Sequence, residues 1–256
     1  MKITLLGCGP SNGVPTIIGD WGVCDPANPR NRRRRPSIAV QQNDFTVLVD
    51  TSPDLREQLI SAGIREIDAV LYTHEHADHV MGIDDLRAIR RHMGRNIDAY
   101  AAPDVLDGLK RRFGYLFAGI QDPEDLYRPI LDSHVINGPL SIGPFEVIQP
   151  IEQDHGICTS LGFRFGKFAY STDVVDFPAA SLDALKGIDT WIVDCLRDGP
   201  LHPTHANLER TLQWIKFVKP CRAILTHMNF ETDYDEMARA CPDWVEPGYD
   251  GMVIEV

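Results

Sequence analysis

The stretch Thr73-His74-Glu75-His76-Ala77-Asp78-His79 places three histidines and an aspartate within one short run. It follows the apolar residues 69–72, which are typical of a buried strand, and precedes residues 80–92, whose apolar spacing predicts a helix. Neutral imidazole and carboxylate groups suit zinc, and a carboxylate-rich set also admits manganese or iron. A polar loop that holds histidines by accident is the alternative, but such a run is rare at this composition. We therefore interpret the stretch as a metal site between a strand and a helix.

Length and composition are ordinary for a globular protein: 256 residues, of which 43% are hydrophobic and 24% charged. No linker divides the chain, so we expect one domain over residues 1–256. A net charge of −12 argues against non-specific binding to nucleic acid or membranes. No apolar run approaches the roughly 18 residues of a membrane span, and residues 1–4 do not begin a signal peptide. The six cysteines are scattered without a Cys-x-x-Cys pair, which predicts reduced core thiols and a cytoplasmic protein.

Strand and helix patterns are interleaved along the chain, with several hairpins, which predicts a mixed α/β fold. We expect strands at 2–6, 37–40, 45–49, 69–72, 97–101, 145–150, 161–165, 168–171, 190–193, 222–225 and 252–256. We expect helices at 53–62, 80–92, 103–113, 178–186, 207–218 and 233–240. Residues 116–139 are expected to be irregular and to arch over the site. The glycines of residues 7–15 lack the following helix of a phosphate loop, so a tight loop near the site is expected instead.

Three further polar residues directly follow predicted strands. They are His155, Asp173 and His227. A site for two metal ions needs more than the four donors of the first motif, and these three would project from one edge of a sheet. Each alone is better interpreted as a capping or core residue, but together with the first motif they favour a binuclear metal site.

The pattern of these residues resembles the metallo-β-lactamase superfamily. Seven positions match its metal motifs in order and type: His74, His76, Asp78, His79, His155, Asp173 and His227. Asp50 matches the acid at the end of the strand before the first motif. The resemblance covers the whole chain and implies an α/β fold, the αβ/βα sandwich of two mixed β-sheets flanked by helices. It also implies that one metal takes His74, His76 and His155, that the other takes Asp78, His79 and His227, and that Asp173 bridges them.

Within that superfamily the chain is similar to the phosphodiesterase branch, in particular to the phosphoribosyl cyclic phosphodiesterases (PhnP). The supporting stretches are Leu6-Gly7-Cys8-Gly9, Gly13-Val14-Pro15, Asp194-Cys195, Thr204-His205-Ala206-Asn207-Leu208, Leu225-Thr226-His227 and Tyr249-Asp250-Gly251-Met252. In this branch His205 matches a non-ligand histidine that acts on the phosphate or leaving group, and nearby His202 has a lesser claim to that role. The branch often holds an extra zinc near its N-terminus. Here only Cys24 of those ligands remains and Phe230 stands where the branch has a histidine, so we expect no structural zinc.

The resemblance implies a small phosphodiester substrate, cyclic and derived from a ribose or nucleotide. Hydrolysis would use water activated by two divalent ions, zinc or manganese. Asp78 and His205 are the expected catalytic residues, with His205 donating a proton to the departing oxygen, and Asp50 would orient a ligand histidine or the water. A lactone or thioester hydrolase shares the ligand set and is an alternative. The acidic charge disfavours a nuclease that processes the 3′ end of transfer RNA. The complete ligand set disfavours a binding protein that has no turnover.

Two features leave alternatives open. Arg30 and Arg32 to Arg35 suit a solvated face that pairs with surface acids, or an anion pocket to which one or two of them contribute. Apolar residues suggest either core positions or the face of a homodimer: Met93, Phe113, Leu116 and Phe117.

Overall fold

The computed structural model describes residues 1–118 and 128–256, whose strands form two seven-stranded sheets. In spatial order, the first sheet contains β14 (Met252–Glu255), β1 (Lys2–Gly7), β2 (Ser37–Gln42), β3 (Phe45–Val49), β4 (Ala69–Leu71), β5 (Ile97–Ala101) and β6 (Leu131–Val135). The second contains β13 (Val245–Pro247), β12 (Arg222–Thr226), β11 (Thr190–Asp194), β10 (Phe168–Ser171), β9 (Thr159–Phe165), β8 (Phe145–Asp154) and β7 (Leu140–Ile142).

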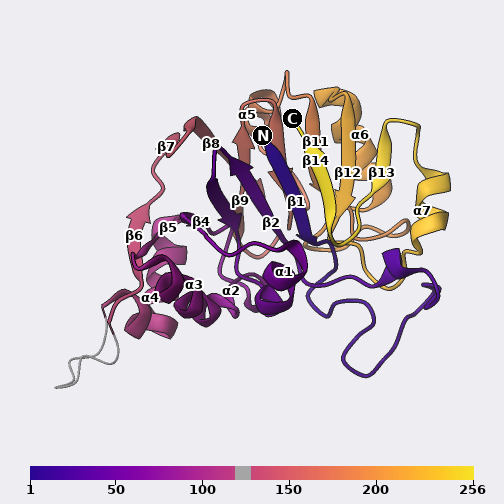
Figure 1. Ribbon diagram of the computed structural model, residues 1–256. Coiled ribbons are helices and arrows are strands. Elements are labelled where there is room, and N and C mark those ends of the chain that lie inside the picture. The colour runs from indigo at the N-terminus through magenta and orange to yellow at the C-terminus, as the bar shows by residue number, and fades with distance from the viewer. Residues whose placement is uncertain (119–127) are drawn as a thin grey trace.

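Helices cover the outer faces of the sheets (Figure 1). The first half of the chain supplies α1 (Leu55–Ala62), α2 (Ala77–Val80), α3 (Leu86–Met93), α4 (Pro103–Phe117) and the 3₁₀ turns η1 (Pro29–Asn31) and η2 (Ile83–Asp85). The second half supplies α5 (Ala179–Ala184), α6 (Leu208–Val218) and α7 (Tyr234–Ala240). This arrangement is the αβ/βα sandwich expected from the sequence, with mixed sheets flanked by helices.

Alternation along the strands explains the layers. In β3, Val47 and Val49 lie in a core shared with Phe163 and Trp191 of the second sheet. Leu48 between them lies in a separate core beneath α1, α3 and α4. Because successive side chains of a strand point to opposite faces, a strand that is buried on both sides must be apolar throughout. The first sheet therefore lies between two hydrophobic cores and contributes side chains to both.

In each sheet the four strands at one end run parallel. In the first sheet these are β3, β4, β5 and β6, and in the second they are β10, β11, β12 and β13. The carboxyl ends of parallel strands meet at one edge of a sheet, so residues that follow these strands are brought together.

The prediction of one continuous helix at 80–92 is wrong. The structure divides this region into α2, η2 and α3. A Cβ at Gly82 would overlap the Ser52 carbonyl oxygen, and the Gly82 N–H donates to the Thr51 carbonyl (2.9 Å), so the chain turns there against the loop that precedes α1. The expectation also missed β6, β7 and β13, which are short and pair at or near the sheet edges. Helix α4 runs four residues past its expected end at Phe113.

The segment 116–139, which the sequence predicts to be irregular, is irregular only in part. It contains the end of α4, β6 and, at its edge, the approach to β7, while its residues 119–127 lie outside the described residues. The proposed dimer face receives no support. Leu116 is buried, Phe113 and Phe117 pack against the core beneath the first sheet, and the Met93 sulfur accepts the Ile67 N–H.

Cysteine burial agrees only in part with the sequence analysis. Cys8, Cys24 and Cys195 are buried, but Cys158 and Cys221 are exposed because they lie in connections at the ends of strands. All six thiols are free. Among the described residues, no helix combines the length and the hydropathy required to cross a membrane.

The arginine run ties an N-terminal excursion to the body of the protein. Residues 8–36 form the long indigo segment beside α7 in Figure 1. Of the two alternatives left open for the arginine run, a solvated face does not apply to Arg33, which is buried and donates to the Asn229 carbonyl (3.0 Å). Arg30 lies over the rings of Tyr234 and Tyr249, with its guanidinium carbon 4.8 Å from the centre of each. These contacts involve the segment after His227, so residues 8–36 pack against one end of the second sheet.

The same excursion holds Cys24, whose thiol donates to the Thr232 carbonyl (3.3 Å) and lies 3.6 Å from the Phe230 carbonyl. Val23 N–H also donates to the Phe230 carbonyl (2.9 Å). Hydrogen bonds therefore join the two segments. That no structural zinc is held there stays a prediction.

Gly22 and Gly19 provide a matched test of this attachment. Both have a left-handed backbone, with φ of +55° and +80°, but a Cβ at Gly22 would overlap the Phe230 carbonyl whereas one at Gly19 meets nothing. Alanine at either position costs about 1–2 kcal/mol in left-handed strain. Urea unfolding should show Gly22→Ala to be less stable than Gly19→Ala by about 1–3 kcal/mol, the usual cost of overpacking. Equal losses would contradict the proposed close packing.

Candidate metal centre

Strand ends deliver the predicted site residues to one edge of the sandwich. Asp50 directly follows β3, His227 directly follows β12, and Asp173 lies two residues past β10. All three have a left-handed backbone, with φ of 64°, 62° and 56°. That conformation is uncommon for residues other than glycine and costs free energy that the surrounding structure must offset. Its repetition at three strand ends makes this edge a candidate functional site.

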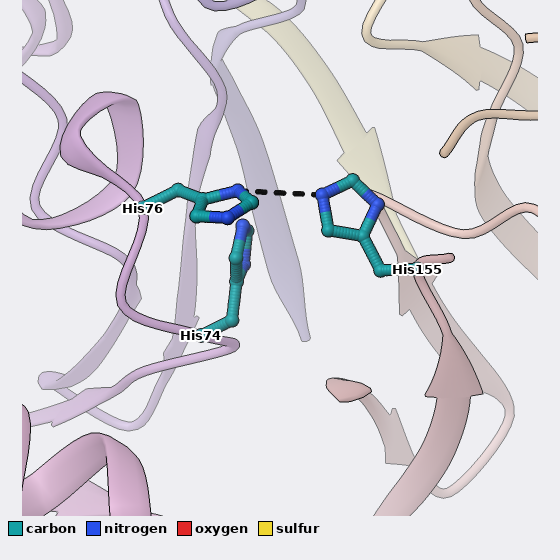
Figure 2. A group of neighbouring side chains, drawn as sticks. All are labelled: His74, His76 and His155. Atoms are coloured by element: carbon teal, nitrogen blue, oxygen red, sulfur yellow. Dashed lines mark hydrogen bonds between the residues drawn. The ribbon is translucent and has the colours of Figure 1, made fainter. Parts of the chain in front are cut away.

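Three histidines form the first group. Figure 2 shows His74 and His76, from the loop after β4, facing His155, which follows β8 of the other sheet. The His74 ring lies 4.4 Å from the His76 ring and 5.1 Å from the His155 ring, centroid to centroid. His155 Nε2 is 3.3 Å from His76 Nδ1. One donor nitrogen from each of the three lies within 4.8 Å of the others.

The second group adjoins the first and consists of Asp78, His79, Asp173 and His227, whose donor atoms also lie within 4.8 Å of one another. Asp173 belongs to the second group but also lies close to two histidines of the first, His74 and His155. Its Oδ2 is 3.0 Å from His79 Nε2, and its Oδ1 is 3.4 Å from His227 Nε2 and 3.5 Å from His155 Nε2. The structure thus brings together all seven residues that the sequence singled out, around one buried carboxylate.

Hydrogen bonds on the outer side of the rings fix their orientation. Asp50 accepts from His79 Nδ1 (2.7 Å) and from the backbone and hydroxyl of Thr73 (both 2.8 Å). The Thr73 hydroxyl in turn accepts from His74 Nδ1 (2.9 Å), and the Thr204 carbonyl accepts from His155 Nδ1 (2.7 Å). With Nδ1 occupied as a donor, each ring turns Nε2 toward the centre.

Several ring nitrogens of the site are buried and lack hydrogen-bond partners. This holds for His74 Nε2, His79 Nε2 and both ring nitrogens of His227. His79 Nε2 is close to Asp173 but not aligned for a hydrogen bond. Buried polar atoms are rarely left unpaired, and imidazole nitrogens beside carboxylates are the donor set of a divalent transition metal. The residues present therefore fit the metal ions that the fold implies.

The two groups differ in the pKa values of their histidines. Burial lowers the pKa of His74 well below its ordinary value, so this ring is neutral. Burial also opposes protonation of His227, but Asp173 and Asp78 outweigh it and raise the pKa of His227 to about 9. Burial would raise the pKa of Asp173, yet His227 and His79 hold it well below the ordinary value. The metal-free second group is thus a cluster of carboxylates and protonated histidines.

His205 lies beside both groups. Its Nδ1 donates to Asp194 Oδ2 (3.0 Å), and its Nε2 is 3.9 Å from Asp173 Oδ1. Its ring stacks on that of His227 at 4.4 Å between centroids. His202 is farther out, with its ring 5.5 Å from that of His205 and its Nδ1 accepting from the Thr204 backbone. The geometry therefore favours His205 over His202 for contact with a bound substrate.

The sequence analysis assigned no role to Asp194, Thr73 or Thr204. A signal existed for Asp194, because it closes β11 between two parallel neighbours that deliver Asp173 and His227. Thr73 and Thr204 act through hydroxyl and carbonyl groups whose direction no sequence pattern specifies.

Comparison with known proteins agrees with this geometry. Residues 46–228 match the family described as the beta-lactamase superfamily domain. The chain belongs to this superfamily. A solved structure described as a new diphosphatase from the PhnP family superposes with a TM-score of 0.90 and 35% identity, covering 99% of this chain and 96% of that one. The expected resemblance to the PhnP-like branch is thereby confirmed.

Two curated relatives carry other names. An octanoyltransferase of Porphyromonas gingivalis is 33% identical over 258 residues, which is 98% of this chain and 51% of that protein. A ribonuclease Z of Bradyrhizobium is 31% identical over 144 residues, which is 54% of this chain and 46% of that protein. The chain spans about half the length of these relatives. The fold and its neighbours indicate a metallohydrolase.

Protons should compete with metal ions at the second group. With its pKa raised to about 9, His227 carries a proton at pH 7 that a metal ion must displace. Apparent metal affinity should therefore rise with pH, by up to about tenfold per unit for each displaced proton, until it levels near pH 9. Calorimetric titration at pH 7 in two buffers of different ionisation enthalpy measures the protons released. Metal binding without proton release at pH 7 would contradict this electrostatic arrangement.

Proposed function

We propose that the protein is a binuclear metal-dependent phosphodiesterase that hydrolyses a small phosphodiester. The observation that carries the proposal is the convergence of seven donor residues, six of them buried, in two adjoining groups. The inward Nε2 atoms of His74 and His79 lack partners, while their outward Nδ1 atoms are already bonded. Such a set is suited to two cations that share one carboxylate.

In this proposal His74, His76 and His155 hold one ion, while Asp78, His79 and His227 hold the other. Asp173 bridges the two, since its oxygens lie near donors of both groups. Zinc and manganese are the candidate ions. When bound, they would neutralise phosphate oxygens and activate water as the nucleophile.

His205 is the proposed proton donor to the departing oxygen. Asp194 accepts the Nδ1 proton, so that Nε2 faces the centre, and in the imidazolium form Nε2 carries the second proton, which would pass to the departing oxygen. Asp194 is itself held by the Val174 N–H (3.1 Å). The role requires a positioned ring close to the substrate, and the stacking of His205 on His227 provides that position.

The substrate class rests on the neighbours. The PhnP-family diphosphatase covers nearly the whole chain at 35% identity, and the ribonuclease Z relatives are named for cleaving a phosphodiester backbone. A cyclic ribose- or nucleotide-derived phosphodiester fits the branch and the metal centre. The octanoyltransferase name points instead to acyl chemistry, and that relative is about twice as long as this chain. The net charge of −12 disfavours a large nucleic acid.

The first test compares substrates. We expect kcat/KM for a ribose cyclic phosphodiester, with zinc or manganese supplied, to exceed that for an acyl lactone, an octanoyl thioester or a transfer-RNA precursor. His205→Ala should lower turnover by about 10²–10⁴-fold, the usual contribution of a positioned acid, while both ions stay bound.

Metal content by mass spectrometry is the control for His205→Ala, because loss of an ion would make His205 a ligand and not a proton donor. His202→Ala is the matched variant and should retain most of the turnover. Preference for the lactone or thioester would reject the phosphodiester assignment. Preference for the transfer-RNA precursor would assign the chain to nucleases.

The second test concerns Asp50, which we propose orients His79. Asp50→Asn keeps the shape of the side chain but removes one acceptor from a set of three hydrogen bonds. Metal affinity should fall by about 10–100-fold, the usual cost of losing such a partner. Asp68→Asn is the matched control, since Asp68 is also buried and accepts the Thr46 N–H (2.7 Å) away from the site. Equal metal affinity in both variants would argue against the role of Asp50.

A further inference from the structure

Helix α4 contacts the loop that follows β4 at Glu75, the residue between the proposed ligands His74 and His76. Arg112 Nη2 donates to the backbone carbonyl of Glu75 (2.8 Å) and to its Oε2 (2.7 Å). Glu75 separates His74 from His76, so a single guanidinium nitrogen holds both the main chain and the side chain at the centre of the motif. A bond to the carbonyl limits rotation of the Glu75–His76 peptide and therefore the direction of the His76 ring.

A glycine permits this close approach. A Cβ at Gly108, one helical turn before Arg112, would overlap Oε2 of Glu75. Arg112 Nε also donates weakly to the Gly108 carbonyl (3.4 Å), which aligns the guanidinium along the helix. Gly108 in the middle of a helix costs about 1 kcal/mol relative to alanine, so its position under the Glu75 carboxylate requires an explanation that helix propensity does not supply.

The same helix holds the far side of the metal motif. The Tyr115 hydroxyl donates to Asp84 Oδ1 (2.7 Å), and Asp84 lies in η2, just after the helix α2 that carries Asp78 and His79. Burial and the Asp84 carboxylate raise the pKa of Tyr115 to about 12, so this donor keeps its proton at neutral pH. Between the two attachments α4 bends at Phe113, whose φ of −126° and ψ of 32° are not helical. Residues 75–84 are therefore bracketed by α4.

We propose that Arg112 is a positioning residue for the metal ion held by His74, His76 and His155, an inference that rests on the metal centre of the proposed function. Its bonds keep the Glu75 carboxylate turned toward α4, away from the donor atoms, and fix the loop that presents the two histidines. The Arg112 and Glu75 side chains are 37% and 46% exposed, and such ion pairs contribute little to global stability. The pair therefore acts on the geometry of the loop and not on the survival of the fold.

The test measures metal affinity, with cobalt(II) titrated into the metal-free full chain and its absorption spectrum recorded. In Arg112→Met, the dissociation constant of one ion should rise by about tenfold or more, with a changed spectrum, while that of the other changes little. Gly108→Ala should behave alike, because it displaces Glu75 while leaving Arg112 in place. Arg112→Lys should give a smaller effect, since it keeps the charge but not the fork of donors. Arg111→Met, an exposed neighbour on the same helix, is the matched control and should bind as the unaltered protein does.

Two results would overturn the proposal. One is an unchanged dissociation constant and spectrum in both Arg112→Met and Gly108→Ala. The other is equal weakening of both ions with a lower Tm, which would make Arg112 a general stabiliser of the fold. If the unaltered chain binds two cobalt ions but hydrolyses no phosphodiester, the proposed function fails, whereas the comparison of Arg112→Met with Arg111→Met still decides the role of Arg112.

Discussion

The buried carboxylate of Asp173 is the constraint on which the rest of the site depends. Five imidazoles from both sheets lie within 3.9 Å of its oxygens, and its own backbone is held in a left-handed conformation. An anion in that position would be costly in a buried environment without positive charge close by. His79 and His227, whose pKa values are raised, supply that charge in the metal-free protein, and metal ions would supply it in the proposed enzyme. The seam between the sheets is therefore organised around compensating one charge.

Much of this arrangement follows from the sequence because the signals are local. Apolar strands followed within three residues by His, Asp or His mark β4, β10 and β12, and parallel pairing within each sheet then brings such ends to one edge. The αβ/βα sandwich followed from the resemblance of the metal motifs to those of the metallo-β-lactamase superfamily. The roles of the seven residues as ligands and the single-domain organisation stay predictions, as does the cytoplasmic location.

What the sequence could not provide depends on tertiary contacts. The break between α2 and α3 comes from packing of Gly82 against the Ser52 carbonyl, although the apolar spacing there is helical. Arg33 looks like one of several solvated arginines, yet its burial follows from a fold that places Asn229 beside it. Short strands such as β7 and β13 carry too few residues for a period of two to be recognised. Asp194 and Arg112 act through neighbours that are distant in sequence.

The division of the donors between the sheets has a consequence for folding. His74, His76, Asp78 and His79 come from the first sheet, while His155, Asp173 and His227 come from the second. Ions bound by both sets would fasten the two halves of the sandwich as a cross-link does, but one whose strength varies with supply. A ligand that binds only the folded state, at a hundred times its dissociation constant, stabilises that state by about 2.7 kcal/mol. The lifetime of this protein would then depend on how much free metal its surroundings contain.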